Sequence, residues 1–202
     1  MKISKIEPQK KNKKRSTIYI DGKFAFGIST ELLIKFDLHE GDELDNDLIQ
    51  NVLLAKEKQR IRNRAFRLLH YRNRAIKELK DRLLKIGFDQ SLVEEVIDEM
   101  VQDRTLDDEN FTEAFIADYT KLRTKGNIFI RRELTRKGVA SDVIERVIRN
   151  RDEKGIVAEY LRAKLSHLDI SQPKDRQKVL RRLLTRGFTP SVVYDALNDY
   201  EK

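Results

Sequence analysis

The sequence of 202 residues contains no cysteine, only three prolines and only eight glycines. Without cysteine, the chain has no disulfide framework, no thiolate zinc site and no cysteine nucleophile. No apolar run approaches the roughly 20 residues that span a membrane, and residues 1–5 lack the apolar stretch of a signal peptide. The lack of cysteine fits a reducing compartment, so we expect a cytoplasmic protein with no membrane partner.

Sequence motifs of enzymes are also missing. There is no GxGxxG, no GxxxxGK[ST] and no serine in a nucleophile elbow. The three histidines, His39, His70 and His167, are far apart and not in a metal-binding spacing. Asp107 and Asp108 are adjacent, and neighbouring helical side chains point about 100° apart, so we interpret them as helix-capping residues. We expect no enzyme activity, no metal and no cofactor.

Charge is what the sequence has in abundance. Lysine and arginine number 42 against 34 aspartates and glutamates, which gives a net charge of +8 and a pI near 9.5. This excess favours an anionic partner, either nucleic acid or a complex that contains it. Positive ends flank an acidic stretch at residues 94–109. Charged residues reach 38% and apolar residues only 39%, which suits an elongated helical protein.

Residues 1–44 have the pattern of a small β-domain. The β-prone runs 17–20 and 23–26 are joined by Asp21-Gly22, which predicts a hairpin with a type I′ turn. A two-residue turn places Ile20 opposite Lys23. Ile3 and Ile6 are candidates for a third strand. The hairpin face that we expect to form a small core carries Tyr19, Phe24 and Phe26.

The pattern changes after the hairpin. Ser29 is expected to cap a short helix that ends at Phe36, and Asp45 is expected to cap a longer one. From Asp45 onward the apolar residues have helical spacing, but residues 56–64 are mostly polar. We therefore predict a β-hairpin extension at 1–44 and a helical connector at 45–64.

The rest of the chain repeats itself. Segments 78–100, 129–151 and 178–200 align without gaps at offsets of 51 and 49 residues. Each copy predicts a helix, a glycine in the left-handed conformation and a second helix, and further helical sequence precedes each copy. We predict a mainly α protein with three tandem three-helix repeats, at 65–109, 110–153 and 154–202, stacked in an elongated, curved array. The columns include Leu83/Leu134/Leu183 and Gly87/Gly138/Gly187.

Basic residues recur near the second helix of each repeat. A basic helix is usually only a solvated face, but recurrence at one place in an array is evidence for partner contact. Lys10–Arg15 is a further basic run, either a solvated loop or an arm that contacts phosphates. One column, Arg74/Lys125/Lys174, keeps its positive charge in all three copies. The candidate partner-binding residues are Arg72, Arg74, Lys77, Lys125, Arg131, Arg132, Arg136, Lys174, Arg176, Arg181 and Arg182.

Two motifs carry a family resemblance. Leu106-Asp107-Asp108-Glu109-Asn110-Phe111 and the run 130–139, Ile-Arg-Arg-Glu-Leu-Thr-Arg-Lys-Gly-Val, together resemble the RecX family of recombination regulators. The resemblance covers residues 65–202, and the hairpin extension looks like that of longer family members. The third copy departs from the family's Glu-Leu pattern, because Arg182-Leu183 stands there.

The resemblance implies a cytoplasmic, non-enzymatic protein that binds the RecA recombinase on single-stranded DNA. Separately, we expect a monomer rather than an obligate oligomer. It implies a position in the groove of the RecA filament and lower ATP hydrolysis and strand exchange, through capping, groove blocking or disassembly. RecA as the partner comes from the resemblance alone. The alternative is an independent DNA-binding protein built from basic helical repeats, whose affinity comes from contacts with phosphates.

Overall fold

The structure, a computed structural model, describes residues 1–10 and 12–200 and is mostly helical within them. Two compact regions divide the chain, the first formed by residues 1–71 and 83–98, the second by 72–82 and 99–202. The elements are β1 (Ile3–Gln9), β2 (Asn12–Ile20), β3 (Lys23–Ser29), α1 (Thr30–Lys35), α2 (Asn46–Tyr71), α3 (Ile76–Ile86), α4 (Gln90–Gln102), α5 (Asp108–Lys121), α6 (Asn127–Arg136), α7 (Ser141–Ile148), α8 (Glu153–Lys164), α9 (Pro173–Thr185) and α10 (Pro190–Tyr200). The predicted mainly helical fold behind a small β extension is confirmed.

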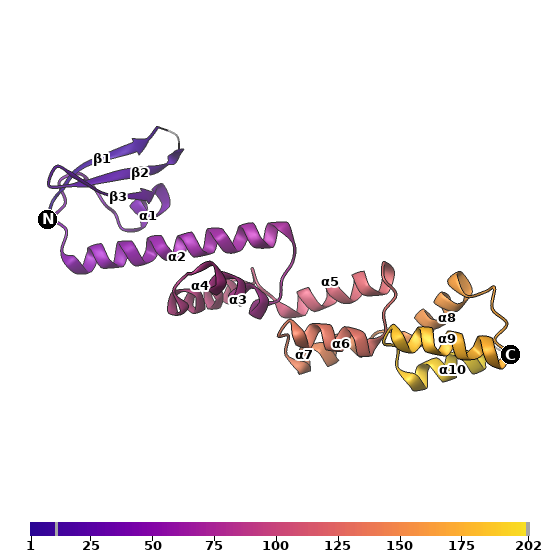
Figure 1. The fold of residues 1–202 in the computed structure, drawn as a ribbon. Helices are drawn as coiled ribbons and strands as arrows, with labels where there is room; N and C mark the ends of the chain where they lie inside the picture. Colours follow the sequence, from indigo (N-terminus) through magenta and orange to yellow (C-terminus); the bar gives the residue numbers. More distant parts are fainter. Residues whose placement is uncertain (11, 201–202) are drawn as a thin grey trace. The chain divides into compact units, whose positions relative to one another are not determined.

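In the first region, three antiparallel strands in the order β1-β2-β3 pack one face against α1 and α2 (Figure 1). The third strand and the pairing of Ile20 with Lys23 are as predicted. Ser29 caps α1 as expected, because its hydroxyl accepts a hydrogen bond from the Leu32 amide at 3.2 Å. The core between sheet and helices is built from Ile3, Ile18, Phe26, Ile28, Leu32, Leu38, Leu44 and Val52.

The expected small core of Tyr19, Phe24 and Phe26 is wrong. Tyr19 does lie opposite Phe24, but the next pair is Ile18 with Phe26, so Ala25 is an extra residue in β3. This bulge turns Phe26 to the face opposite that of Phe24. As a result, Phe26 is 8% exposed in the core and Phe24 is 68% exposed.

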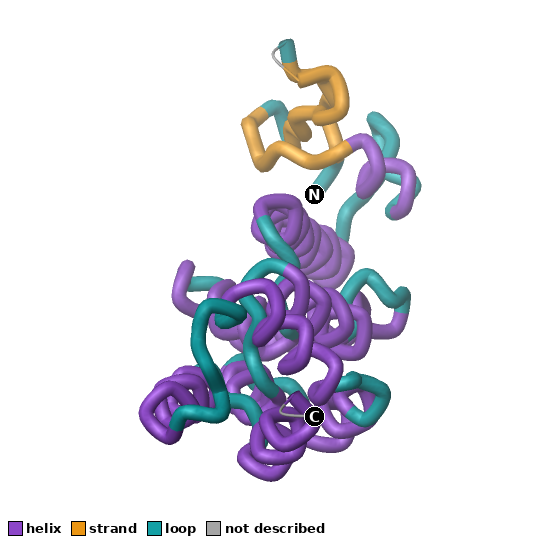
Figure 2. Tube along the Cα trace, turned by 90° about the vertical axis from the view of Figure 1, so that its right-hand side faces the viewer, coloured by secondary structure: helices purple, strands orange, loops and turns teal. Residues whose placement is uncertain are grey.

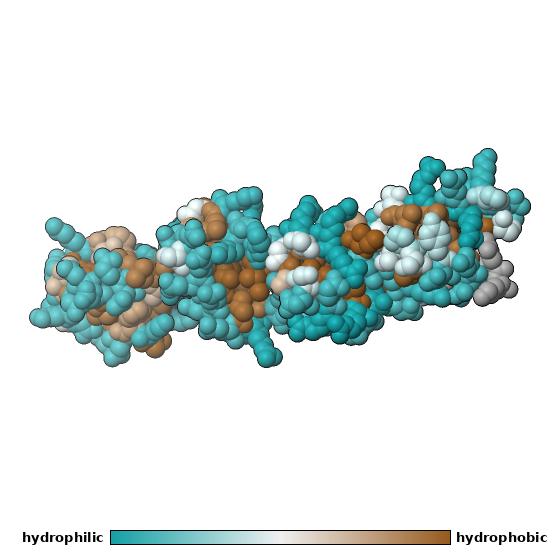
Figure 3. Space-filling view, turned by 90° about the horizontal axis from the view of Figure 1, so that it is seen from below, coloured by the Kyte–Doolittle hydropathy of each residue, from teal (hydrophilic) through white to brown (hydrophobic). Residues whose placement is uncertain are grey.

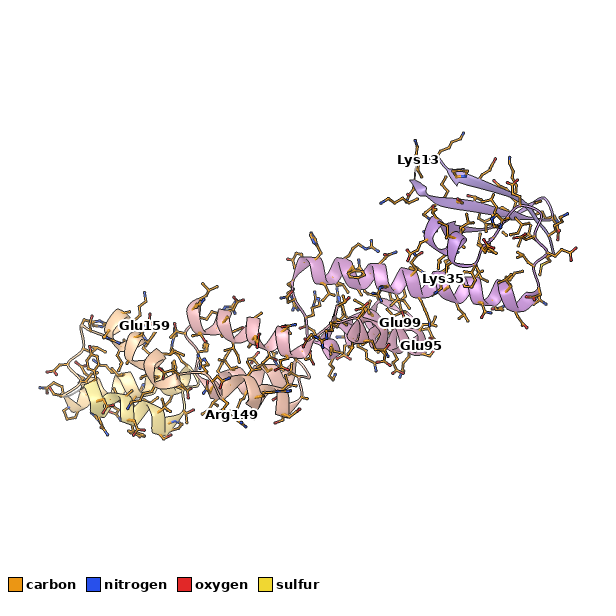
Figure 4. All side chains as sticks on the ribbon, turned by 180° about the vertical axis from the view of Figure 1, so that it is seen from behind. Lys13, Lys35, Glu95, Glu99, Arg149 and Glu159 are labelled. Atoms are coloured by element: carbon orange, nitrogen blue, oxygen red, sulfur yellow. The ribbon has the colours of Figure 1, made fainter. Side chains whose placement is uncertain are left out.

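The basic run between the first two strands is not a plain loop. Strand β2 begins at Asn12, so Lys13, Lys14 and Arg15 belong to the sheet. Lys11 lies outside the described residues. In Figure 4, the side chain of Lys13 extends from the end of the sheet. The sheet itself therefore displays these cations.

Helix α2 is one element where the sequence predicted two. It runs from Asn46 to Tyr71, and the preceding Asp45 caps it as expected, because the Asp45 carboxylate accepts a hydrogen bond from the Leu48 amide at 2.6 Å. The stretch expected as a connector (45–64) and the start of the first repeat share this helix. The polar residues 56–64 are good helix formers without glycine or proline, and the buried Ile61 and Ala65 anchor them.

The second region holds two three-helix groups in sequence, α5–α7 and α8–α10 (Figure 1). Figure 2 distinguishes the strands of the first region from the helices and loops that make up the described part of the second. Hydrophilic side chains cover much of the face drawn in Figure 3, with apolar side chains in separate patches. Gly138 and Gly187 end α6 and α9 with φ of +84° and +80°, and Gly87 ends α3 with +97°, which confirms the predicted left-handed caps. Leu83, Leu134 and Leu183 are all fully buried.

Candidate partner-binding surface

In the second region, two pairs of acidic residues stand at the starts of α5 and α8, and the second acid of each pair bonds to the start of an earlier helix. Asp107 caps α5 by accepting hydrogen bonds from the Glu109 and Asn110 amides at 2.8 and 3.3 Å. The next residue, Asp108, instead accepts from the Ile76 amide at the start of α3, at 2.9 Å. The first acid thus caps its own helix, and the second satisfies an exposed amide of the preceding group.

The same device recurs at the next junction. Asp152 caps α8 by accepting from the Gly155 amide at 2.8 Å, while Glu153 accepts from the Asn127 amide at the start of α6, at 2.6 Å. Glu153 also accepts from the Thr189 hydroxyl at 2.7 Å, so it links the start of α8 to the residue that precedes α10. The prediction that Asp107 and Asp108 are helix-capping residues is confirmed for Asp107, which caps its own helix. Asp108 accepts a hydrogen bond from the start of a different helix, α3.

Backbone groups complete the junction between α6 and the turn after α9. The Gly126 amide donates to the Arg186 carbonyl at 3.1 Å, and the Ile128 amide donates to the Gly187 carbonyl at 3.0 Å. A Cβ on Gly126 would lie 2.2 Å from backbone atoms of Gly187 and Phe188. The two groups are therefore in direct backbone contact, and the helices they carry are fixed relative to each other.

The side chain of Arg151 stabilises this junction through three hydrogen bonds. Its guanidinium donates to the Thr120 hydroxyl at 2.9 Å, to the Asn127 side-chain carbonyl at 2.5 Å and to the Lys125 backbone carbonyl at 2.6 Å. Burial lowers the pKa of Arg151, and nearby Glu153 works in the opposite direction. The loop that carries the half-buried Lys125 is thus held at its backbone.

A run of aromatic rings crosses the second region. Phe111, Phe115 and Tyr119 are spaced four residues apart on α5, so they share one face. Ring centroids are 6.0 Å apart for Phe111 and Phe115, 4.3 Å for Phe115 and Tyr119, and 5.3 Å for Tyr119 and Phe129 of α6. These are the separations of favourable aromatic pairs.

Cations lie over each of these rings. Lys137 is 5.8 Å from the centroid of Phe111, Arg123 is 4.8 Å from Tyr119, and Lys125 is 4.6 Å from Phe129. Such contacts orient a cation while leaving part of it in water. We call this set of rings, some of them buried, and the cations over them the cation–aromatic row. Its residues are Phe111, Phe115, Tyr119, Arg123, Lys125, Phe129, Arg132, Lys137, Tyr160, Arg182 and Arg186.

The row continues onto the last three-helix group. Arg186 and Arg182 of α9 lie 4.8 and 6.0 Å from the ring centroid of Tyr160. Arg186 also donates to the Arg123 backbone carbonyl at 3.3 Å, across the junction. The second region therefore presents cations from both groups in one connected set of contacts.

One carboxylate anchors the other end of the row. Glu78 accepts hydrogen bonds from Arg72, from Arg74 at 2.7 Å and from Lys137 at 3.0 Å. Burial alone would raise the pKa of Glu78, but the hydrogen bonds from Arg72 and Lys137 outweigh it and lower the pKa to about 2. Three cations share one acid here, so the cluster has an excess of positive charge.

A Glu78→Gln variant is expected to lower the stability of the second region by about 1 to 2 kcal/mol at pH 7, because the three cations lose their counter-charge in a partly solvated site. Since the pKa of Glu78 is about 2 when folded and about 4.5 when unfolded, this contribution is full above pH 4.5. It is lost as the pH falls through 2. Urea titrations at pH 7, 4 and 2.5 measure the difference. Asp81→Asn, which removes the exposed pair of Lys77 with Asp81, should cost less than about 0.5 kcal/mol.

The structure brings some of the predicted residues together. Lys125, Arg132 and Arg182 are in the row, and Arg72 and Arg74 reach it through Glu78. Arg136 lies nearby on α6, where it pairs with Glu133 at 2.5 Å, and Arg132 is 3.8 Å from the same carboxylate.

The other predicted residues have separate surroundings. Arg131 forms a two-bonded pair with Glu145 at 2.6 and 2.9 Å, which raises the pKa of Arg131. Arg176 donates to Asn198 at 2.7 Å, and Lys174 and Arg181 are exposed on α9. The column Arg74/Lys125/Lys174 does not share one environment, because Arg74 is only 11% exposed and bound to Glu78.

Three cations of the row were absent from the predicted set, namely Arg123, Lys137 and Arg186. The signal that could have found Arg123 is its spacing, four residues after Tyr119 and eight after Phe115. Lys137 and Arg186 occupy equivalent positions before Gly138 and Gly187. Their contacts with rings of other helices depend on tertiary packing, which a single sequence does not reveal.

Metal-binding groups and membrane-spanning helices were searched for in the part of the chain that the structure describes. Residues 1–10 and 12–200 hold no group of three or more histidine, aspartate or glutamate side chains placed to bind a metal ion. None of the helices described is both long and apolar enough to cross a membrane.

Three sequence models of one family match this chain. Residues 1–45 match the N-terminal domain of regulatory protein RecX, residues 62–100 the first RecX three-helix domain, and residues 107–148 the second. Relatives named "Regulatory protein RecX" include those of Bacillus velezensis and Bacillus subtilis, each 32% identical over 98% of this chain and 77% of the relative. The relative in Clostridium beijerinckii is 29% identical over 95% of this chain and 92% of its own.

Solved structures agree with these matches. A crystal structure of a regulatory protein RecX superposes with a TM-score of 0.78 at 28% identity, over 98% of both chains. RecX from Lactobacillus salivarius shares the fold with a TM-score of 0.63 at 22% identity, over 73% of this chain and 98% of the other. The sheet, the capped helical groups and these matches together place this chain in the RecX family of regulatory proteins.

Proposed function

We propose that this protein regulates homologous recombination and DNA repair by binding the RecA filament on single-stranded DNA, where it lowers ATP hydrolysis and strand exchange. It acts in the cytoplasm as a monomer, by occupying a surface and not by turning over a substrate. Family membership supports the regulatory role. The observation that carries the proposal in this chain is the cation–aromatic row, which offers fixed positive charge to an anionic assembly.

Two well-exposed cations, Arg132 of the row and its neighbour Arg136, are on α6. The side chains of Arg132 and Arg136 are 70% and 74% exposed. They share Glu133, so one acid neutralises only part of the charge of two arginines. Arginine side chains with free donors bind phosphates and carboxylates in two-bonded geometry. Both a DNA backbone and an acidic protein surface fit this pair.

The first experiment measures ATP hydrolysis by RecA on single-stranded DNA, with and without substoichiometric amounts of this protein. We expect inhibition at near-physiological salt, because a bound regulator affects several filament subunits. An unchanged hydrolysis rate at that salt would refute the proposed function.

An Arg132→Glu/Arg136→Glu variant is expected to weaken this inhibition at least tenfold, because reversal replaces two attractive contacts by repulsive ones. The matched control is Arg146→Glu/Arg149→Glu, which makes the same change in net charge at an exposed residue of α7 and at its exposed C-cap, in the same helical group; Figure 4 labels Arg149. The inhibition constant and the helical circular dichroism are measured for both. Equal weakening by the two variants would assign the effect to net charge and remove Arg132 and Arg136 from the binding surface.

The alternative, an independent DNA-binding protein, predicts a different salt response. If contacts with bare DNA supply the affinity, the binding constant should fall steeply with salt and inhibition should follow it. The acidic stretch at residues 94–109 argues for a surface that also meets protein. Inhibition that persists at salt where bare DNA is released would favour the recombinase filament as the target.

A further inference from the structure

The face of the N-terminal sheet away from α1 and α2 has a composition that the core does not explain. Cross-strand partners share a face, and the pairs of β2 with its two neighbours define this one. We call it the outer sheet face. Its residues are Lys5, Glu7, Arg15, Thr17, Tyr19, Phe24, Gly27 and Ser29.

Two aromatic rings stand at one end of the outer sheet face. Tyr19 and Phe24 are directly opposite each other in the strand pairing, with ring centroids 6.4 Å apart and planes at 85°. The Phe24 side chain is 68% exposed, although the same bulge that places it there buries Phe26. A phenylalanine ring held in water on a sheet contributes little to folding, and its flat face is available to a ligand.

The next part of the face is flat and cationic. Gly27 has no side chain, and the Arg15 guanidinium lies across it, donating to the Gly27 carbonyl at 3.4 Å. A Cβ at position 27 would come within 2.9 Å of the Gln9 side-chain nitrogen. The side chains of Gln9 and Arg15 therefore lie close to the backbone of this glycine. A planar guanidinium stacks on aromatic faces as well as pairing with phosphates.

The charge of this part of the chain is strongly one-sided. Residues 1–29 contain eight lysines and arginines but only two acids, a net charge of +6 out of +8 for the whole chain. Glu7, the one acid of the outer sheet face, pairs with Lys5 at 2.5 Å, and the hydrogen bond from Lys5 lowers the pKa of Glu7. Lys13 projects from the end of the sheet (Figure 4). The positive charge of this part of the chain therefore favours an anionic ligand at the outer sheet face.

We propose that the outer sheet face binds single-stranded nucleic acid, with a base stacked on Phe24 beside Tyr19 and the backbone phosphates near Arg15 and Lys13. Exposed rings interleaved with cations on a sheet are the features that bind unpaired bases and their phosphates. An acidic peptide would use the cations but has no groups that need an exposed ring. A paired duplex would satisfy the phosphate contacts but keeps its bases stacked on one another.

This site goes beyond the proposed function. It belongs to the first region, whereas the cation–aromatic row belongs to the second, and it is tested without any recombinase. Failure of either proposal therefore leaves the other standing.

The first test measures the anisotropy of a labelled 20-nucleotide oligothymidylate with the full chain. Phe24→Ala is expected to weaken binding about fivefold to a hundredfold, the usual effect of losing one base–aromatic stack. The matched control is Ile34→Ala, which removes a side chain that is 72% exposed on α1 of the same region and should leave binding unchanged. Loss of affinity in both variants, or in neither, would overturn the proposal.

The second test uses the absence of tryptophan from the sequence. A Phe24→Trp variant has a single indole at the proposed stacking position, and its fluorescence should be quenched when oligothymidylate binds, with affinity close to the original. Duplex DNA of the same length should give little quenching. No quenching at oligonucleotide concentrations that saturate the anisotropy signal, or equal quenching by duplex, would refute base stacking at Phe24.

Discussion

Replacing Gly126 by alanine is expected to lower the free energy of unfolding of the second region by about 3 kcal/mol, at the upper end for overpacking. The new Cβ would lie 2.2 Å from the Gly187 carbonyl oxygen and from Phe188 backbone atoms. Backbone cannot rotate away as a side chain can, so the turn after α9 must separate from the start of α6. That movement breaks the two amide–carbonyl bonds between them.

Hydrogen exchange gives the sharpest measurement of this effect. The amides of Gly126 and Ile128, which donate to Arg186 and Gly187, should lose protection in the variant, while amides inside α5 keep theirs. Gly27→Ala is the control, because its nearest neighbour is the end of the Gln9 side chain at 2.9 Å, which can move. Retained protection at Gly126 and Ile128 would show that the contact is looser than described.

The Glu153→Ala change is expected to cost about 3 kcal/mol. The Glu153 residue is only 6% exposed, and its carboxylate accepts from the Asn127 amide, the Thr189 amide and the Thr189 hydroxyl. Alanine leaves these donors without an acceptor in a site with little access for water, and each such loss costs about 1 to 3 kcal/mol. The measurement is calorimetry of the full chain, following the transition of the second region.

Glu153→Gln separates hydrogen bonding from charge at the same position. Its amide oxygen can still accept from the Asn127 amide, and its NH2 group can donate to the Thr189 hydroxyl, so we expect a loss of less than about 1.5 kcal/mol. Glu145→Gln, in an exposed pair with Arg131, should cost less than about 1 kcal/mol. A glutamine variant as unstable as the alanine variant would mean that the negative charge, and not hydrogen bonding, stabilises the junction.

The repeat pattern was predictable because it depends on local features. An apolar residue every three or four positions and a glycine at each helix end determine α3, α6 and α9 without reference to neighbours. The bulge at Ala25 was not predictable, because any residue fits the extra position of a bulge. One residue of shift in the strand register then reversed the predicted places of Phe24 and Phe26.

The residues of the candidate surface were also predictable from the sequence only in part. Counting recurrent basic residues selected Lys125, Arg132 and Arg182, which the structure places in the row. It could not distinguish Arg131, whose partner Glu145 is 14 residues away. Pairing of this kind depends on how helices pack, so a cation that is free in the sequence can be neutralised in the fold.

The acidic pairs share one direction of contact, toward a helix that comes earlier in the chain. Each second acid satisfies an amide of the group before it, at Ile76 and at Asn127. The equivalent position in α9 is Arg176, but α9 begins a turn earlier at Pro173, and the Arg176 amide already donates to the Gln172 carbonyl at 3.0 Å. A further group added by duplication would find no amide there for its carboxylate. Lengthening this fold would therefore require shortening α9 first, a constraint on how such proteins could have grown.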